Sequence, residues 1–494
     1  MPPAPPPSTL PARRLATRLP ALVLGALQLA LAACSTELEP VGPRPRLVVV
    51  VVMDTLAAGH VSHLGYDRLT TPNLDALARD GVTFEEALSP ASYTVASIPS
   101  LLTGRLPDRH GLVWYKKSLP DEEVTLSEIF RAAGYATFGA VAVANGGSAY
   151  GNDQGFDEFV EVYLGEGAPG ARTIERKGRT VHLPAAEEIV PIVRERLDRM
   201  AKDERLLLYL HFLQPHGPYD PPFAYKCRFQ DERYPGPYRE GDGDRAQERV
   251  RAGGLDEKTK QEVIHLYDAN VYWADESLGA VFDKLRGRGL YDDALIVVTA
   301  DHGEAFWQHG RVGHGEKVYE EYVRVPLVVK LAGGEAPRGV RIPGLVSTLD
   351  VLPSLCDWLD LPAPGNVLDG RSFAELVAEP GRPSRHDALL LRSGEKSGRF
   401  GLRTSTAKVV VHVETDESGA RTVRSVELYD LVEDPLELVN VAGERPDEAA
   451  ALARRALAHL AELRSAQRVE PGQLPVADIV LLRELGYTGL DAGE

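Results

Sequence analysis

Two strongly apolar segments of the chain end in acidic residues. Residues 46–54 read RLVVVVVMD and residues 295–302 read LIVVTADH, so Asp54 and the Asp301-His302 pair each follow a run typical of a buried strand. A lone Asp after a strand more often caps a helix, but two such ends with an adjacent imidazole require a positive charge among the carboxylates. We therefore expect one divalent metal ion, bound by Asp54, Asp301 and His302.

A hydroxyl-rich segment supplies candidate nucleophiles. Residues 92–104 read SYTVASIPSLLTG and place five Ser and Thr side chains in a turn marked by Pro and Gly. Covalent catalysis often uses a hydroxyl exposed on such a turn, whereas a Ser/Thr-rich helix N-cap is the simpler explanation. These residues alone leave open which hydroxyl, if any, does chemistry.

The elements that must position these residues alternate between strands and helices. Residues 71–81 show a complete helix pattern, with Thr71 as N-cap, Pro72 at the first position and Gly81 as terminator. This alternation predicts a doubly wound α/β fold, in which ligands bind beyond the carboxyl ends of the strands. The other expected elements are helices at 126–133 and 263–286 and strands at 46–54, 134–143, 206–213 and 295–301.

A change of pattern near Ser384 predicts a second, smaller unit. Hairpin-like strands are followed by an Ala/Leu-rich helix at 446–463, which indicates a C-terminal α+β subdomain. Between Tyr225 and Lys260 the chain is rich in Arg, Asp, Glu, Gly and Pro, which predicts an exposed insertion without a core of its own. The expected strands of the subdomain lie at 400–404, 408–413 and 422–428.

The composition is that of a folded, acidic protein. Its 494 residues, 44% of them hydrophobic and 26% charged, suffice for one large α/β domain with an appendage. The formal net charge is −17. Because both nucleic acid and anionic membrane surfaces would repel such a chain, we expect neither as a direct partner.

The N-terminal region has the features of an export signal. Residues 1–18 are Pro-rich with three Arg, and residues 19–31 form an apolar run too short to span a bilayer. The run ends in Leu-Ala-Ala-Cys, which resembles a bacterial lipobox, so we expect a signal peptide at 1–33 and lipidation of Cys34. Residues 34–45 then form a short linker. A plain cleaved signal with an accidental Cys is the alternative. The lipid would anchor the protein in the cell envelope, on the periplasmic or extracellular face.

Two other cysteines follow the linker. An exported protein meets an oxidising compartment, so Cys227 and Cys356 can form a disulfide. Two free thiols explain the same count equally well.

Eight segments in consistent order resemble a sulfatase-type member of the alkaline phosphatase superfamily. The likeness spans roughly residues 46–465. It implies an α/β/α sandwich with a mixed, mostly parallel sheet, a smaller four-stranded C-terminal subdomain, and metal-assisted hydrolysis of sulfate or phosphate esters. The matching segments are VVMDTL (51–56), TPNLD (71–75), TGRLPDRHG (103–111), GFD (155–157), QPHGPYDP (214–221), ADHGE (300–304), GHGEKVYEEYVRVP (313–326) and ELYDLVEDP (427–435).

The resemblance selects one hydroxyl of the opening turn. In sulfatases this turn reads Cys or Ser, any residue, Pro, Ser, Arg, before Leu-Thr-Gly, and the Cys or Ser becomes formylglycine. An ungapped match anchored on Thr103-Gly104 puts Thr94 at the modified position and Ile98 at the Arg. A rival register makes Ser97 the first residue of the motif but needs three deleted residues.

Threonine at this position implies a different nucleophile. Thr cannot become formylglycine, but its oxygen can attack directly, as in Thr-dependent phosphodiesterases and transferases of the superfamily. A metal ion that binds the Thr94 oxygen would lower the pKa of the hydroxyl. A helix starting near Ser97 would direct its N-terminus at the bound anion. Sulfatases commonly carry Asp-Asp after the first strand, whereas Thr55 follows Asp54 here, so the resemblance implies a single ion (Ca, Mg, Mn or Zn) with fewer acidic ligands.

Further site residues follow from the same resemblance. Thr94 would be the nucleophile and a ligand of the metal ion together with the two acids and His302. His216 and His314, the latter in place of a sulfatase Lys, would polarise the ester oxygens or protonate the leaving group. His211, His309 and Lys116 are further substrate-binding candidates. The alternatives are a hydrogen-bonded core histidine for His211 and a surface lysine for Lys116.

Three functions remain open at this point. The first is a hydrolase of small-molecule, glycan or lipid esters, with phosphoesters favoured over sulfates by the chemistry of Thr94. The second is a transferase that passes a phospho-group from or to a lipid or envelope polymer, and the third is an inactive binding lipoprotein with the same fold. The expected catalytic domain spans residues 46–383, the C-terminal subdomain 384–465 and a tail 466–494.

Overall fold

The computed structural model describes most of the chain from Arg44 onward. The described residues are 44–113, 115–165, 173–176, 179–229, 253–333, 337–394, 397–415, 421–465, 471–475, 478–479 and 482. The predicted signal peptide, Cys34 and the first part of the linker lie outside them. No helix of the described residues is both long and apolar enough to cross a bilayer.

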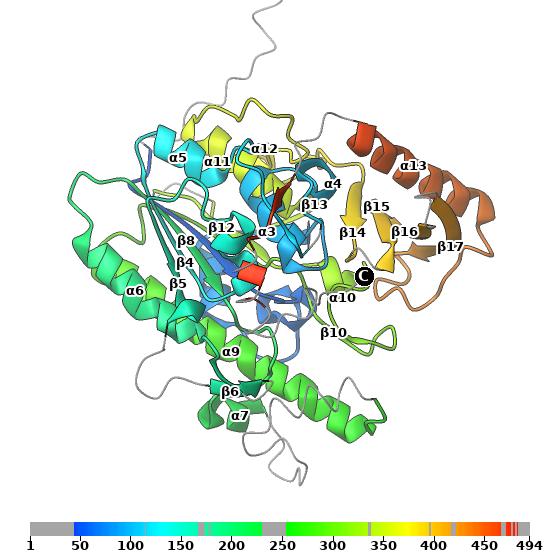
Figure 1. Cartoon of the computed structure of the whole chain (residues 1–494), viewed down its shortest axis with the longest axis horizontal. Coiled ribbons are helices and arrows are strands. Elements are labelled where there is room, and N and C mark those ends of the chain that lie inside the picture. Colours follow the sequence, from blue (N-terminus) through cyan, green and yellow to red (C-terminus); the bar gives the residue numbers. More distant parts are fainter. Residues whose placement is uncertain are drawn as a thin grey trace, which may run out of the picture. The chain divides into compact units, whose positions relative to one another are not determined.

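A mixed sheet is the centre of the fold (Figure 1). The strand β12 is antiparallel to both of its neighbours, and every other neighbouring pair of this sheet is parallel. The expectation of a mixed, mostly parallel sheet is therefore confirmed. In sheet order the described strands are β13 (Val340–Ser347), β2 (Val82–Leu88), β12 (Leu327–Lys330), β9 (Ala294–Thr299), β1 (Leu47–Met53), β8 (Leu206–Phe212), β4 (Ala136–Val141) and β5 (Glu158–Glu161).

The all-apolar sequence of β1 follows from its burial on both faces. All seven of its residues are buried. Val48, Val50 and Val52 belong to one hydrophobic core, whereas Val49 and Val51 belong to the other. The first core includes residues of α3 (Thr94–Thr103), α5 (Leu126–Ala132), α11 (Val351–Leu359) and α12 (Ala374–Ala378). The second includes residues of α2 (Pro72–Asp80), α6 (Ala186–Arg199) and α9 (Glu257–Gly287).

The helices follow their sequence signals, with one difference in detail. The helix α2 begins at Pro72 after Thr71, as predicted. The Thr71 hydroxyl caps no backbone N–H of α2; it donates to Asp75 Oδ1 at 2.9 Å and accepts from the Ser62 N–H at 3.1 Å. The helix α3 begins at Thr94, three residues earlier than expected.

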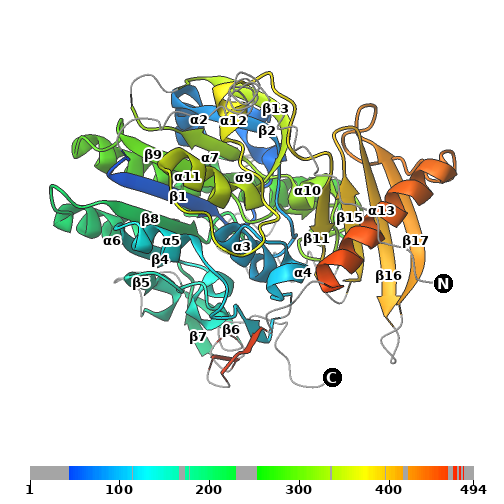
Figure 2. The ribbon, with the colours of Figure 1, turned by 90° about the horizontal axis from the view of Figure 1, so that it is seen from above.

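The C-terminal subdomain pairs an antiparallel sheet with one helix. Its strands are β14 (Leu389–Arg392), β15 (Arg399–Arg403), β16 (Ala407–Thr415) and β17 (Arg421–Asp430). The helix α13 (Pro446–Ser465) lies across this sheet (Figure 2). Ala449, Ala453, Ala456, Leu460 and Leu463 recur at helical spacing and pack against the sheet, which is the physical reason for the Ala/Leu pattern.

Two segments outside the expected elements contain regular structure. Within the expected insertion Phe223–Phe229 forms α7, and α9 begins at Glu257. Tyr225 stacks on Trp273 of α9 at 6.2 Å between ring centroids. Part of the C-terminal tail is also ordered, since Gly472–Gln473 forms β18.

The cysteine alternatives are resolved in favour of thiols. Among the described residues Cys227 is exposed, Cys356 is buried, and both are free.

The remaining described elements are η1 (Ala58–His60), η2 (Ser62–Leu64), α4 (Pro107–His110), β3 (Lys117–Ser118), η3 (Ala144–Gly146), η4 (Ser148–Tyr150), η5 (Val162–Leu164), β6 (Thr173–Arg176), β7 (Arg179–His182), β10 (Ala305–Phe306), β11 (Val312–Gly313), α10 (Glu320–Val323) and η6 (Thr348–Asp350).

Candidate active site

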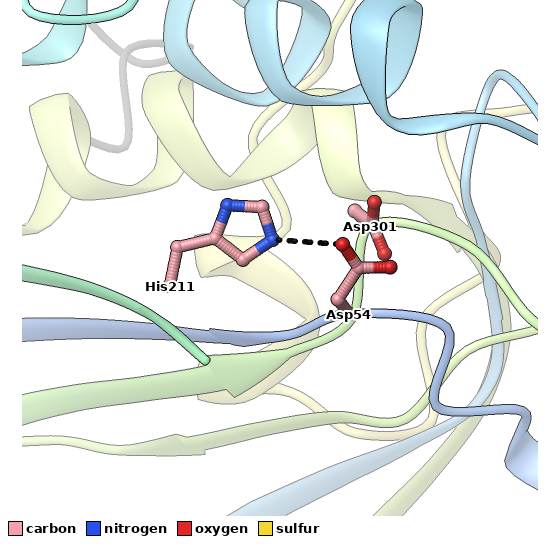
Figure 3. A group of neighbouring side chains, drawn as sticks. All are labelled: Asp54, His211 and Asp301. Carbon is pink, nitrogen blue, oxygen red and sulfur yellow. Dashed lines mark ion pairs between the residues drawn. The ribbon is translucent and has the colours of Figure 1, made fainter. Parts of the chain in front are cut away.

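The strand register brings three titratable side chains together at the carboxyl edge of the sheet. His211 of β8 and Thr299 of β9 both pair with Val52 of β1. Side chains alternate along a strand, so Asp54 and Asp301, each two residues further on, extend the face that α3 covers. One ligand atom from each of Asp54, His211 and Asp301 lies within 4.8 Å of the others (Figure 3).

These three side chains are buried, and most of their polar atoms lack a hydrogen-bond partner among the described residues. Within the described chain, neither oxygen of Asp54, neither ring nitrogen of His211 and not the Oδ2 atom of Asp301 has a hydrogen-bond partner. Burial, followed by the charges of Asp301 and Glu304, raises the pKa of Asp54 well above its usual range. Burial lowers the pKa of His211 to about 4, so the ring is neutral near neutral pH. Buried acceptors without donors fit a bound cation.

His211 is therefore not the hydrogen-bonded core histidine that its mid-strand position suggested. Its Nε2 lies 3.8 Å from Asp54 Oδ2. Gly146 leaves room for the ring, because a Cβ there would lie 2.5 Å from His211 Nδ1. The ring can therefore approach the two acids and offer a nitrogen to the same cation.

Hydrogen bonds to backbone groups fix the side chains of Asp301 and His302. Asp301 Oδ1 accepts hydrogen bonds from the backbone N–H groups of Thr55 at 3.0 Å and His302 at 2.8 Å. His302 Nδ1 donates to the Gly303 carbonyl at 3.0 Å, which leaves a lone pair on Nε2. That Nε2 lies 3.2 Å from Asp301 Oδ2, and two lone pairs at this distance repel unless a cation lies between them. An N–H bonded to a carbonyl behind the ring is typical of metal-ligating histidines.

Thr94 lies at the start of α3, beside His302. Its Oγ1 is 3.2 Å from His302 Nε2, and the residue is buried. As the first residue of a ten-residue helix it lies where backbone N–H groups and the helix dipole favour an anion. Ser97, the rival nucleophile, lies one turn further along and donates its hydroxyl to the Tyr93 carbonyl at 3.1 Å.

His216 and His314 form a further side of the site. The His314 ring is 5.0 Å from that of His216 and 4.6 Å from that of His302. His216 Nδ1 donates to the Gly217 carbonyl at 2.6 Å, and burial followed by His314 lowers the pKa of His216 to about 3. His314 Nδ1 lies 3.3 Å from both carboxylate oxygens of Glu304. Three imidazoles thus surround the space next to Thr94.

The other two predicted binding residues lie on neighbouring segments. His309 Nδ1 is 2.7 Å from Glu321 Oε1, its Nε2 is 2.8 Å from the Glu437 carbonyl, and its ring stacks on Tyr319 at 3.7 Å. Both nitrogens are thus used within the fold. Lys116 is exposed, and its carbonyl accepts a hydrogen bond from Leu474.

Sequence reasoning assigned no role to two residues near the site. Glu304 lies in the quoted ADHGE segment, and its contact with His314 joins residues ten apart. Tyr115 lies in a segment without periodicity, and its ring is 6.1 Å from that of Tyr93. Burial, followed by Tyr93 and Asp54, raises the pKa of Tyr115. Only the Glu304 segment carried a sequence signal.

Two family models match the chain. The model described as Sulfatase matches residues 46–361, and the model described as N-sulphoglucosamine sulphohydrolase, C-terminal, matches residues 314–466. Together they cover the α/β domain and the C-terminal subdomain.

Known proteins agree with these matches. The chain is 25% identical to the ulvan-active sulfatase of Formosa agariphila over 421 residues, which cover 82% of this chain and 78% of that protein. Its fold is similar to that of a solved protein in complex with its substrate D-glucosamine-2-N,6-O-disulfate, with a TM-score of 0.71, 18% identity and coverage of 86% of this chain and 99% of that one. The phosphonate monoester hydrolase of Agrobacterium radiobacter gives a TM-score of 0.66 at 21% identity, with coverage of 85% and 96%.

Proposed function

This chain belongs to the sulfatase family and is a hydrolase of sulfuric or phosphoric esters, and we propose that Thr94 is its nucleophile. The observation that carries the proposal is the position of the Thr94 hydroxyl. Its oxygen lies at the N-terminus of α3 and 3.2 Å from His302 Nε2, beside carboxylates that lack partners among the described residues. The Ser97 hydroxyl, in contrast, is bonded to the backbone of its own helix.

Asp54, Asp301, His302 and Thr94 would hold one divalent cation, with His211 as an added nitrogen ligand. When bound, the cation supplies the positive charge that lowers the pKa of the Thr94 hydroxyl. Ca²⁺ prefers sites made of oxygen ligands alone, whereas imidazole suits Zn²⁺. A donor set that mixes carboxylates with imidazoles therefore favours Mn²⁺ or Zn²⁺ over Ca²⁺.

In the proposed reaction the Thr94 oxygen loses its proton to solvent and attacks the phosphorus or sulfur atom of the ester. A bond forms to Thr94 and the bond to the alcohol oxygen breaks. His314, whose side chain is 25% exposed, donates a proton to the departing alcohol. His216 is half-buried and its pKa is lowered to about 3, so it is neutral near neutral pH and holds the ester in place rather than supplying a proton. Water then cleaves the Thr94 ester, which releases the inorganic anion and restores the hydroxyl.

Phosphate esters should be better substrates than sulfate esters. Formylglycine cannot form at a threonine, so Thr94 must attack as an alkoxide. The N-terminus of α3 favours the more highly charged phosphate anion. The sulfated amino sugar and the phosphonate monoester of the structural neighbours add two substrates to test, and a glycan or aryl ester is the substrate class we propose.

We also propose that Cys34 carries a lipid anchor in the cell envelope. Arg44 precedes the amino end of β1, whereas Asp54 follows its carboxyl end. Cys34→Ala should move the protein from the membrane to the soluble fraction or block its processing. Equal fractionation of both forms would contradict the anchor.

The decisive experiment compares Thr94→Ala, Thr94→Ser and Ser97→Ala. Each is assayed on aryl phosphate, phosphodiester, phosphonate and sulfate esters with added Mn²⁺, Zn²⁺, Mg²⁺ or Ca²⁺. Thr94→Ala should abolish turnover, Thr94→Ser should retain a measurable part of it, and Ser97→Ala should change it little. Intact-mass analysis after acid quenching should find one phosphoryl or sulfuryl group on wild type, Thr94→Ser and Ser97→Ala, but none on Thr94→Ala.

Three outcomes would contradict the proposal. Full activity of Thr94→Ala would place the nucleophile elsewhere. A wild-type protein that binds a cation yet acts on none of these esters would favour the inactive binding lipoprotein. Transfer of the phospho-group to an added alcohol in preference to water would favour the transferase.

A further inference from the structure

A short strand near the C-terminus returns to the catalytic domain. The helix α13 ends at Ser465 in the C-terminal subdomain. Beyond it, β18 pairs antiparallel with β3, with Gly472 opposite Ser118 and Gln473 opposite Lys117 (Figure 2). The Leu474 N–H donates to the Lys116 carbonyl at 3.2 Å. These residues follow residue 466, where the family match ends.

We call residues 471–475 together with Ile479 and Leu482 the C-terminal strap. Leu474 and Leu482 are 4% and 1% exposed, and both belong to the hydrophobic core that includes α3. Ile479 packs against the same core. Gly472 allows the close approach to β3, because a Cβ there would lie 2.3 Å from Ser118 Oγ. The strap is thus attached by apolar side chains as well as by strand pairing.

The segment that the strap holds carries Tyr115, whose ring contacts that of Tyr93. Tyr93, whose ring is 6.1 Å from that of Tyr115, directly precedes the proposed nucleophile Thr94. The Tyr115 carbonyl accepts a hydrogen bond from the Tyr150 hydroxyl at 3.1 Å. Tyr115 is therefore fixed from two sides, by Tyr150 at its own peptide and by the strap at the next residues.

We propose that the C-terminal strap sets the position of Tyr115, and that Tyr115 contacts the alcohol portion of the ester. A tyrosine beside an anion site suits a cyclic alcohol, such as a sugar or an aryl group, because its ring packs against an apolar face while its hydroxyl bonds a polar one. The strap is then a specificity-determining element that acts through Tyr115. The contact between Tyr115 and the substrate rests on the proposed ester hydrolysis, whereas the positioning of Tyr115 by the strap does not.

Kinetics of strap variants test the functional part. Leu474→Asp removes the buried anchor, Gly472→Val crowds Ser118, and Gln473→Ala changes an exposed side chain of the same strand as a control. We expect the first two to raise the KM for aryl esters about fivefold, the size of a lost aromatic contact, and to change kcat less than about twofold. The Ki of inorganic phosphate, which has no alcohol portion, should not change.

A double-mutant cycle separates this effect from general loosening. Leu474→Asp in a Tyr115→Ala background should raise KM no further, because the strap would act through the missing ring. Additive effects, or an equal rise in the Ki of inorganic phosphate, would overturn the proposal. So would a normal KM in both strap variants.

Trypsin provides a readout that does not depend on activity. Lys116 and Lys117 lie in the paired segment, so loss of the strap should expose the bonds after them. Mass spectrometry should detect cleavage after these lysines at least about tenfold faster in Leu474→Asp and Gly472→Val than in wild type and Gln473→Ala. Unchanged protection would overturn the strap. Faster cleavage in a protein without ester activity would retain the strap and reject the proposed function instead.

Discussion

Lys408 and Asp54 are both fully buried, yet their charges meet different surroundings. The Lys408 ammonium forms ion pairs with Glu320 and Glu437, each at 2.8 Å, where β16 of the C-terminal subdomain meets the catalytic domain. Both oxygens of Asp54 lack a hydrogen-bond partner in the described part of the chain. One region thus contains its own counter-charges, and the other contains acids that face one another.

The two regions differ in what compensates their buried charges. A buried ion pair is stable once formed, because each charge compensates the desolvation of the other. Buried carboxylates that face each other without a counter-charge destabilise the fold unless a ligand supplies it. The carboxyl edge therefore fits a bound cation, whereas the region around Lys408 joins two parts of the protein through counter-charges of its own.

The largest effect is expected from removal of Lys408. Lys408→Met would leave the buried Glu437 without its counter-charge and Glu320 with only Arg403 at 3.6 Å, which should lower the free energy of unfolding by about 3–5 kcal/mol. Urea denaturation measures the change. Lys330→Met is the matched control, because the buried Lys330 ammonium bonds the carbonyls of Asp292 and Ala294 instead of carboxylates. Equal losses for both variants would contradict the role of the ion pairs.

Removal of one facing acid should have the opposite effect on the metal-free protein. Asp301→Asn relieves the repulsion at Asp54, so the free energy of unfolding without metal should rise. Bound metal should fall well below one ion per chain. Ester turnover should drop by more than about 100-fold, because loss of a residue that only supports a metal ligand already costs up to about that much. Metal analysis and denaturation measure the two parts. Asp275→Asn, at a buried acid bonded to Asn73 and Leu74, should lower stability but keep the metal.

The contribution of the Lys408 ion pairs to stability should also depend on pH. Burial, only partly offset by Lys408, raises the pKa of Glu437 to about 7 in the folded protein. The folded state therefore binds this proton more tightly than the unfolded state, whose Glu pKa is about 4.3. Relative to Glu437→Gln, wild type should lose stability as pH rises from about 4.5 to about 7, on the order of 2 kcal/mol, and remain constant above. A rise over this range would contradict the assignment.

The smallest effect is expected from a substitution at Gly146, which lies behind the His211 ring. Gly146→Ala would place a Cβ 2.5 Å from His211 Nδ1 and displace the ring. The affinity for Mn²⁺ or Zn²⁺, measured by titration calorimetry, should fall about tenfold. Gly59→Ala is the control, because a Cβ there meets nothing within 4 Å. Unchanged affinity would remove His211 from the proposed ligand set.

Local sequence signals were enough for most of the fold. The apolar run of β1, the Thr-Pro start of α2 and the Ala/Leu spacing of α13 each predicted the element found. Strand ends also predicted that Asp54 and Asp301 would meet, because parallel strands share a carboxyl edge. The predicted domain boundaries and the lipidated Cys34 remain predictions.

Other features depended on contacts between distant residues. His211 joins the acids only because β8 pairs with β1 in a register that sets it beside Val52. Tyr115 and the strap residue Leu474 belong to segments more than 350 positions apart. Neither segment has a periodicity that predicts the pairing of the two.

The sequence by itself determined which residues could do chemistry, since residue type and strand or turn context are local properties. It determined that the position aligned with the modified Cys or Ser of sulfatases holds Thr94, and hence the kind of nucleophile that we propose. Only the tertiary structure decided which side chains share the buried edge and which of them lack partners. The physical reason is that register, burial and counter-charge are properties of packed pairs, and no single segment contains both members of a pair.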